Sequence, residues 1–281
     1  MCGRYAITLP PEAVRAFFQY AEQPNFPPRY NIAPTQPVPI VRMQRGQAGK
    51  TRHFNLVRWG FLPGFVKDPK EFPLVINARS ETVLDKPSFR NAMRRRRCIF
   101  IADAFYEWRR DKTQPDKNSA DKNRGKAASV PFLIRRRDGN PMAFAGLWEA
   151  WMGPNGEEQD TACIVTTDAN GVMAAIHDRM PVILEPQDFD TWLDNDDVEV
   201  EDAARLMRPA AEEVLEAFRI STAVNKVAND NPDIQRPATD QPAAPEERLA
   251  EERLADKRLA DKRPARKAAA RKPPDDYGTL F

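Results

Sequence analysis

Residues 97–108 read RCIFIADAFYEW, and this stretch decides the fold class. Branched and aromatic side chains fill it, which predicts a buried β-strand. Five further runs share this composition and are also predicted strands: HFNLVRWGF (53–61), VPFLIRR (130–136), MAFAGLWEAW (142–151), TACIVTT (161–167) and PVILE (181–185). Apolar residues at helical spacing predict helices at PEAVRAFFQYAE (11–22), QDFDTWL (187–193) and VEDAARLM (200–207). Because strands and helices do not alternate regularly, we expect a single α+β domain with mainly antiparallel sheets and peripheral helices.

The composition of the chain changes sharply after Asn225. Residues 226–281 contain two aromatic residues, Tyr277 and Phe281, and 23 charged residues. Such a segment buries too little apolar surface to offset the entropy lost on ordering. It also contains a five-residue repeat, EERLA-EERLA-DKRLA-DKRPA (246–265), whose period does not align its leucines on one face of a helix. We therefore predict a folded domain over residues 1–225 and a disordered charged tail over residues 226–281.

Charge is unevenly distributed, although the formal net charge is only +2. Residues 86–137 hold 16 Lys and Arg against 5 Asp and Glu, whereas residues 185–202 hold nine acidic residues and no basic one. A basic band of this size, which includes residues 94–97 and 135–137, favours nucleic acid as a partner. A solvated arginine-rich surface is the alternative. The polar stretch 112–130 is predicted to be a mobile loop that joins two strands.

The cysteine and hydropathy patterns narrow the class of protein further. Three cysteines are too few for a disulfide framework, which indicates a reducing compartment. No apolar run approaches the ~18 residues that span a bilayer, and the start MCGRYAIT lacks the features of a signal peptide. Histidines and cysteines do not occur at the spacing of metal ligands, so no metal and no cofactor are expected. These observations predict a cytoplasmic protein without membrane association, and we expect a monomer.

Cys2 is the first candidate for chemistry. Initiator methionine is commonly removed when the second residue is small, and Cys2 would then carry a thiol and an α-amine on adjacent carbons. Such an aminothiol reacts with an aldehyde to form an imine and then a five-membered thiazolidine. Nearby cations would lower the pKa of both groups and make them more reactive. The alternative is an inert cysteine in a frayed terminus.

Four further polar residues are candidates for the site. Glu107 lies between Tyr106 and Trp108, and a carboxylate among aromatic rings can act as a general acid or base near neutral pH. His177 precedes a predicted strand, where functional residues are common. Asn77 and Arg79 follow the run LVI and would point an amide and a guanidinium into one cleft. The alternatives are a Glu107 that faces water or pairs with Arg109, and an Asn77–Arg79 segment that only forms a turn.

These residues belong to a series of motifs in a fixed order. The motifs are MCGR (1–4), RYNIAP (29–34), WGFLPG (59–64), INARSET (76–82), RCIFIADAFYEW (97–108), FAGLWE (144–149), IVTTDA (164–169), IHDRMPVIL (176–184) and STAVN (221–225). Residues 2–225 resemble the SRAP (SOS response-associated peptidase) family. The resemblance implies a single SRAP-fold domain that recognises abasic sites in single-stranded DNA. It also implies that Cys2 crosslinks to the ring-opened sugar through a thiazolidine, which shields the site during the DNA damage response.

The resemblance also implies a role for individual positions. Cys2 matches the nucleophile and crosslinking residue, and Asn77 matches the residue that orients it. Glu107 matches the acid/base for opening of the sugar ring and for proton transfers at the imine. His177 matches the residue that assists at the sugar oxygen and promotes strand cleavage or reversal of the crosslink.

The same comparison implies contacts with DNA. Arg4 and Arg79 match phosphate contacts, and Trp108 and Pro34 match the groups that contact and stack on bases, as is usual for single strands. Two features depart from the family pattern: the stretch 112–130 is longer than in compact members, and the charged tail has no counterpart.

Two other functions remain open from the sequence. One is a cysteine peptidase or N-terminal nucleophile hydrolase, with Cys2 attacking an acyl carbon and His177 as its base. The other is a single-strand-binding module that acts without covalent chemistry. The apolar end Leu280–Phe281 resembles peptides that dock on bacterial sliding clamps, which would tether the protein to replicating DNA and associate it with the nucleoid. A sticky end that binds nothing is the alternative.

Overall fold

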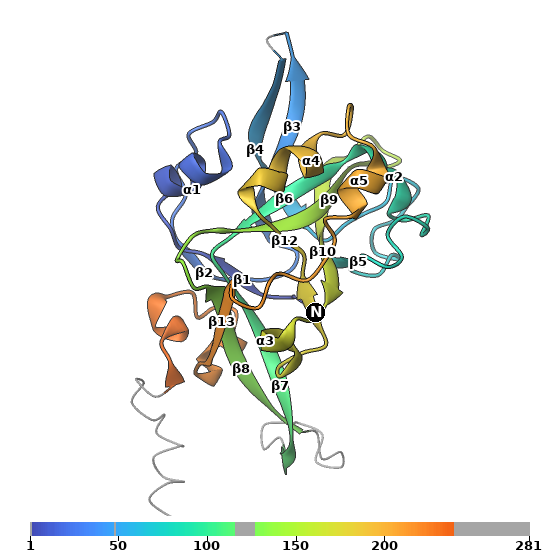
Figure 1. Ribbon diagram of the computed structural model, residues 1–281. Coiled ribbons are helices and arrows are strands. Elements are labelled where there is room, and N and C mark those ends of the chain that lie inside the picture. Colours follow the sequence, from blue (N-terminus) through green and yellow to red (C-terminus); the bar gives the residue numbers. More distant parts are fainter. Residues whose placement is uncertain (1, 48, 116–126, 239–281) are drawn as a thin grey trace, which may run out of the picture. The chain divides into compact units, whose positions relative to one another are not determined.

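Two sheets contain the thirteen strands found in the described residues of the computed structural model, which are 2–47, 49–115 and 127–238. The first sheet has the order β13–β8–β7–β1–β2, and the second has the order β11–β10–β4–β3–β6–β9–β12, with β5 paired to β10 (Figure 1). Because β9 also pairs with β10, the strands β10, β4, β3, β6 and β9 form a closed ring. Among the strands of the described residues, only β10–β4 and β10–β5 pair in parallel. The predicted α+β class with mainly antiparallel sheets is confirmed.

The bounds of the elements follow from their sequences. The first sheet contains β1 (Tyr5–Ile7), β2 (Arg29–Ile32), β7 (Ala104–Pro115), β8 (Ala127–Arg136) and β13 (Leu215–Arg219). The second contains β3 (Pro37–Gly46), β4 (Gly49–Trp59), β5 (Asn77–Arg79), β6 (Arg97–Ala102), β9 (Met142–Met152), β10 (Glu158–Asp168), β11 (Arg179–Pro181) and β12 (Ile183–Leu184). The helices are α1 (Pro11–Phe18), α2 (Arg90–Arg95), α3 (Gly171–Ala174), α4 (Phe189–Leu193) and α5 (Val200–Ala204), with 3-10 turns at η1 (Pro186–Asp188), η2 (Thr222–Asn225) and η3 (Pro232–Gln235). None of these helices in the described part is long and apolar enough to cross a membrane.

The decisive stretch 97–108 forms two strands in different sheets. Every residue of β6 is buried, and β6 lies between β3 and β9. The chain then turns at Asp103, whose carboxylate accepts hydrogen bonds from the backbone N–H of Leu9 (2.8 Å) and the hydroxyl of Thr8 (3.0 Å). This corner passes the chain into β7, which pairs with β1. The turn at Asp103 therefore takes the chain out of the closed ring, and Glu107 lies on β7 next to the N-terminal strand β1.

The acidic stretch 185–202 pairs with the β3–β4 hairpin. Lys50 binds the carboxylates of Asp194 and Asp197, the latter at 2.6 Å, and Arg52 binds Asp190 at 2.7 Å. These ion pairs hold α4 and the loop that joins α4 to α5 against the hairpin. Figure 1 shows the hairpin projecting at the top of the domain. Intramolecular pairing therefore accounts for much of this acidic run.

Two predicted boundaries need correction. The folded unit extends beyond residue 225 to at least 238, because η3 packs on the domain through buried Ile234 and Ile220 pairs with Pro237. Compositional analysis missed this because a single apolar side chain anchors the turn. The predicted loop 112–130 is also too long, since β7 runs to Pro115 and β8 begins at Ala127. Residues 116–126 and 239–281, including the remainder of the predicted loop and tail, lie outside the described residues.

Candidate functional site

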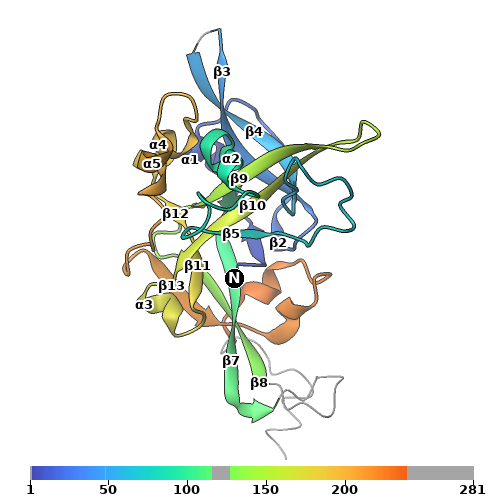
Figure 2. The same ribbon diagram turned by 90° about the vertical axis from the view of Figure 1, so that its right-hand side faces the viewer.

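The pairing of β1 with β7 brings Cys2 to Glu107. Tyr5 pairs with Phe105, and the backbone N–H of Tyr106 donates to the carbonyl of Arg4 at 2.9 Å. If the register of β1 and β7 is continued toward the N-terminus, the residues before Arg4 lie opposite Glu107. Both side chains are buried: Cys2 has no exposed surface, and Glu107 is 4% exposed. Figure 2 shows the N mark at the upper end of β7.

Burial and charge set the protonation of the Cys2 thiol. Burial raises its pKa well above the usual value, and the neighbouring Glu107 carboxylate raises it further. The positive charge of the chain's N-terminus and a hydrogen bond from the backbone of Arg4 lower the pKa, but the net shift is upward. A nearby cation thus acts in the expected direction, while burial and the carboxylate outweigh it and favour the neutral thiol.

Asn77 reaches the same place from the second sheet. Residues of β5 pair in parallel with β10, with Asn77 opposite Ile164, and this directs the amide toward the N-terminal segment. Its Nδ2 donates to the carbonyl oxygen of Cys2 at 3.0 Å. Its Oδ1 is buried and accepts no hydrogen bond from the described residues. The structure thus brings Cys2, Glu107 and Asn77 together. The Oδ1 of Asn77 can accept a hydrogen bond from a further donor.

His177 lies in the turn between α3 and β11. Its Nδ1 accepts from the backbone N–H of Arg179 at 3.0 Å and lies 2.9 Å from the Asp178 carboxylate. Since β11 and β5 both pair with the C-terminal half of β10, His177 and Asn77 are carried by two neighbours of one strand. The role of His177 in the site stays a prediction.

Arg4 and Trp108, two of the predicted DNA contacts, lie together. The Arg4 guanidinium carbon is 5.8 Å from the centre of the Trp108 ring. Arg4 Nη1 donates to Asn31 Oδ1 at 2.7 Å and to the carbonyl of Val224 at 3.0 Å. Trp108 Nε1 donates to Asn225 Oδ1 at 2.7 Å. Both side chains are half-buried, and burial lowers the pKa of Arg4.

Pro34 and Arg79, the other two predicted contacts, lie at chain corners. Arg79 is exposed at the end of β5. Pro34 is half-buried and precedes Thr35, whose φ of 73° is unusual for a β-branched residue. Reciprocal backbone bonds hold this corner, from Thr35 N–H to the Trp59 carbonyl (2.8 Å) and from Trp59 N–H to the Gln36 carbonyl (3.0 Å). Backbone strain of this kind persists only where surrounding bonds enforce it, and it is common at ligand contacts.

The predicted basic band divides into structural and exposed arginines. Arg97 is completely buried, and its guanidinium donates to the carbonyls of Trp192 (2.6 Å) and Met93 (3.0 Å), so the expectation that it contacts phosphate is wrong. Burial lowers its pKa to about 10. Three more arginines pair with carboxylates: Arg96 with Glu149 (3.1 Å), Arg135 with Glu216 (2.7 Å) and Arg136 with Glu185 (2.9 Å). Arg94, Arg95 and Arg137 are exposed.

Two residues at this surface were missed by sequence reasoning. Asn31 and Asn225 hold Arg4 and Trp108, and each lies within a motif that had been noted only for the family resemblance, RYNIAP and STAVN. An asparagine beside a predicted strand carries no signal about a partner 27 or 117 residues away. The motif membership was the available signal.

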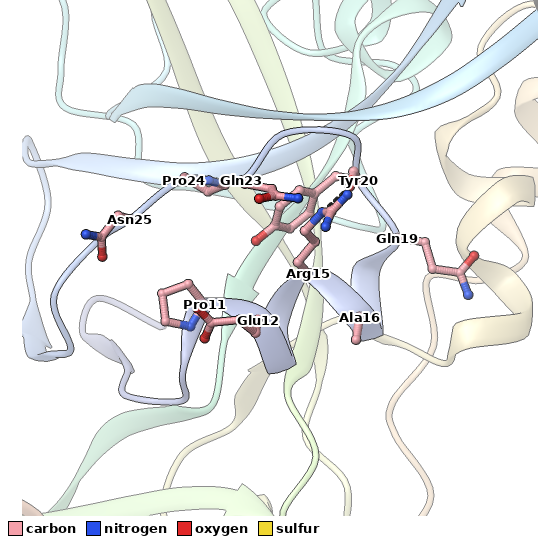
Figure 3. A pocket seen from close by; sticks show the side chains of 9 residues that line it. All are labelled: Pro11, Glu12, Arg15, Ala16, Gln19, Tyr20, Gln23, Pro24 and Asn25. Carbon is pink, nitrogen blue, oxygen red and sulfur yellow. Dashed lines mark hydrogen bonds between the residues drawn. The ribbon is translucent and has the colours of Figure 1, made fainter.

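The predicted site residues lie neither in a metal cluster of the described ranges nor in the cavity beside α1. No group of three or more His, Cys, Asp or Glu side chains in the described ranges could hold a metal ion. A cavity of about 770 Å³ lies beside α1 and the segment that follows it, where Figure 3 shows the Tyr20 ring between Arg15 and the Gln23–Asn25 loop. None of the predicted site residues lines this cavity.

Comparisons with known proteins identify relatives of this chain. The family described as SOS response associated peptidase (SRAP) matches residues 1–227. The chain is similar to the abasic site processing protein YoqW of Bacillus subtilis, with 34% identity over 239 residues that cover 83% of this chain and 98% of that protein. It is 30% identical to the abasic site processing protein HMCES of Xenopus tropicalis, covering 83% of this chain and 77% of that one. Its fold matches a crystal structure of a Bacteroides thetaiotaomicron protein with a TM-score of 0.71 and 24% identity, over 84% of this chain and all of the other.

Proposed function

The chain belongs to the SOS response associated peptidase (SRAP) family, and from this premise we propose that it captures abasic sites in single-stranded DNA through a covalent bond to Cys2. The observation that carries the proposal is the grouping of Cys2, Glu107 and Asn77 in one buried site. A single buried cysteine would be an ordinary core residue. A cysteine at the second position, next to a buried carboxylate and bound by an amide, is an assembled reaction site.

The reaction has two bond-forming steps after Met1 is removed. The free α-amine of Cys2 attacks the aldehyde carbon of the ring-opened sugar, and the aldehyde oxygen leaves as water to give an imine. The Cys2 sulfur then adds to the imine carbon, and the thiol proton ends on the imine nitrogen. The net reaction joins one aldehyde and one aminothiol into a thiazolidine with release of one water. It needs no oxidant and no cofactor.

Glu107 and Asn77 have distinct roles in this scheme. Glu107 transfers protons: it protonates the departing oxygen and accepts the thiol proton, as a general acid and base. Asn77 holds the Cys2 carbonyl at 3.0 Å and so fixes the position of the amine and thiol on the same residue. Its buried Oδ1 is placed to accept a hydrogen bond from a proton donor that enters the site.

Two finer activities belong to the same proposal. Removal of Met1 by the protein itself accounts for the peptidase in the family name and produces the amine that the reaction requires. His177, at the neighbouring end of β10, assists at the sugar oxygen and promotes strand cleavage or reversal of the crosslink. DNA is held by Arg4, Arg79, Trp108 and Pro34 through phosphate contacts and stacking.

Intact-mass measurement tests the proposal directly. Mixing the purified protein with an abasic single-stranded oligonucleotide should yield a species with the mass of protein lacking Met1 plus DNA minus one water. An undamaged strand should give no adduct. An unchanged mass would favour the non-covalent binding module, and cleavage of a peptide substrate would favour the hydrolase.

Variants at the N-terminus separate the two steps. Cys2→Ser and Cys2→Ala retain the amine and should trap the aldehyde only transiently. An extra residue before Cys2 blocks the amine and should abolish both transient and stable adducts. A Cys2→Ala protein that gives a heat-stable adduct at the wild-type rate would remove the thiazolidine from the mechanism and assign the chemistry to a lysine.

The proposed sliding-clamp contact concerns Leu280–Phe281, which lie outside the described residues. It stays a prediction, and so does an association with the nucleoid. Deletion of residues 277–281 should remove the clamp from a pull-down without changing crosslinking by the isolated protein. A deletion that changes no partner would end this hypothesis.

A further inference from the structure

Residues 221–235, here called the C-terminal segment, pack against the strands that carry the proposed DNA contacts. Val224 and Ile234 are buried in one apolar cluster with Ala6 and Tyr106, and Trp108 packs against it. The Tyr106 hydroxyl donates to the Tyr30 carbonyl at 2.6 Å and accepts from Gln235 Nε2 at 3.0 Å. The segment therefore belongs to the folded domain, although its composition predicts the start of a tail.

Asn31 connects this segment to β2. Its side chain is 1% exposed, and its Nδ2 donates to the carbonyls of Val224 (3.2 Å), Lys226 (3.2 Å) and Asn229 (2.8 Å). The backbone N–H of Asn31 donates to the Asp230 carboxylate at 3.0 Å. With its donors used in this way, the Oδ1 of Asn31 is directed to Arg4. A buried asparagine with this many partners has a fixed orientation.

Two of the proposed DNA contacts, Arg4 and Trp108, are held by hydrogen bonds to the C-terminal segment, and Arg4 is also held by Asn31. Arg4 Nη1 is shared between Asn31 Oδ1 and the Val224 carbonyl, at 2.7 and 3.0 Å. Trp108 Nε1 donates to Asn225 Oδ1 at 2.7 Å. The bond to Asn225 uses the ring edge and therefore leaves a ring face able to stack. The Arg4 guanidinium retains further N–H groups for a phosphate.

We infer that the C-terminal segment is a positioning element for DNA binding: Asn225 sets the orientation of the Trp108 ring, and Asn31 with the Val224 carbonyl sets that of Arg4. The inference rests on the proposed function, because it takes Trp108 and Arg4 as DNA contacts. A side chain held in its bound orientation loses less conformational entropy on binding. Asn225 thus strengthens DNA binding without touching DNA itself.

Asn225 is the residue on which the inference can be tested. It is exposed, so its replacement does not disturb the core, whereas Asn31 is buried and its replacement would also loosen the fold. Asn225→Ala removes the acceptor of Trp108 Nε1. Trp108→Phe keeps an aromatic face and removes the N–H. Thr222→Ala, at another exposed position of the same 3-10 turn, is the matched control.

The experiment is a double-mutant cycle read by two assays. Fluorescence anisotropy with an undamaged labelled single strand measures non-covalent affinity, which does not depend on crosslinking. Asn225→Ala should weaken binding about threefold to tenfold, the usual effect of one lost neutral hydrogen bond. In the Trp108→Phe background the same change should have no effect, because there is no N–H left to hold. Thr222→Ala should bind as the wild type does.

Crosslinking to an abasic strand gives the second readout. Asn225→Ala should raise the DNA concentration at half-maximal rate by the same factor and leave the limiting rate unchanged. Equal effects of Asn225→Ala in both backgrounds would show a direct contact of Asn225 with DNA and overturn the inference, as would wild-type affinity of the single variant. A wild-type protein that binds the strand but forms no adduct would refute the proposed chemistry, while the affinity cycle would still decide the role of the segment.

Discussion

Replacing Glu107 with glutamine should change two reactions of Cys2 in opposite directions. The Glu107 carboxylate is one cause of the raised pKa of the buried Cys2 thiol. Glutamine keeps the shape of the side chain and removes its negative charge. Deprotonation of the Cys2 thiol should then cost less free energy, so alkylation of Cys2 should become faster. Glutamine cannot transfer a proton, so crosslinking to an abasic strand should become slower.

The size of each effect follows from general electrostatics and acid–base catalysis. Two like charges ~4–6 Å apart repel by about 3 to 4 kcal/mol at an effective dielectric constant of ~20. Since ~1.4 kcal/mol corresponds to a factor of ten and the site partly relaxes, alkylation should be about 10-fold to 100-fold faster. Loss of a general acid/base typically costs about 10² to 10⁴ in rate. The two rates should therefore diverge by several orders of magnitude.

Both rates can be measured on the same preparations. Iodoacetamide labelling is followed by mass spectrometry of the N-terminal peptide, because Cys98 and Cys163 are also buried and must be distinguished. Crosslinking is followed on denaturing gels with an excess of abasic strand. Glu149→Gln is the matched control, since Glu149 is another buried glutamate in a strand. It lies on β9 and pairs with Arg96. It should leave both rates at the wild-type value.

The reasoning fails if the two rates move together. Slower alkylation in Glu107→Gln would mean that the carboxylate does not repel the thiolate. Unchanged crosslinking would remove Glu107 from the proton transfers. A variant with both rates reduced and an altered unfolding curve would assign Glu107 a purely structural role.

Three further predictions concern other parts of the domain. Asn77→Ala, which removes the bond to the Cys2 carbonyl, should slow single-turnover crosslinking about tenfold at saturating DNA, and an unchanged rate would contradict its orienting role. Arg97→Met should lower the free energy of unfolding in urea by about 1 to 3 kcal/mol for each carbonyl that it leaves without a donor, whereas Arg95→Gln should leave it unchanged and reduce the log–log salt slope of single-strand binding by ~0.7. The pKa of Asp138 is lowered from 3.8 to about 2 by Arg136, so its stabilising effect is present above pH 3.8 and lost as the pH falls through 2. The difference in Tm between the wild type and Asp138→Asn should therefore be largest near pH 6 and vanish near pH 2.

Composition located the runs that contain β4 and β6 to β12, but it did not predict β1, β2, β3, β5 or β13 and could not show where a run divides into two strands. The run 97–108 is apolar on both sides of Asp103, and nothing local indicates that this carboxylate accepts bonds from Thr8 and Leu9, some 95 residues away. The domain boundary was misplaced for a similar reason. Two interactions anchor a stretch of otherwise polar residues: Ile234 is buried, and the Asp230 carboxylate accepts a hydrogen bond from the backbone of β2. Local averages do not detect anchors this sparse.

The site shows the same limit. Cys2 and Glu107 were identified individually from their chemistry, and the family resemblance supplied their connection. The net pKa shift of Cys2 is upward although nearby cations were expected to lower it, because the fold surrounds the thiol with apolar groups and a carboxylate. Arg97 was counted with exposed arginines, since sequence proximity to Arg94 and Arg95 says nothing about which side chain enters the core.

The buried, neutral thiol also determines the order of the proposed steps. Burial and the Glu107 carboxylate raise the pKa of the Cys2 thiol and disfavour its thiolate, which makes the α-amine the better nucleophile toward the aldehyde in the proposed first step. The amine therefore reacts first. The imine that forms is cationic when protonated, and a positive charge next to sulfur lowers the thiol pKa and reverses the effect of the carboxylate. The thiolate is then produced beside the electrophilic carbon only after the aldehyde has been captured, which protects Cys2 from alkylation and oxidation until a substrate is bound.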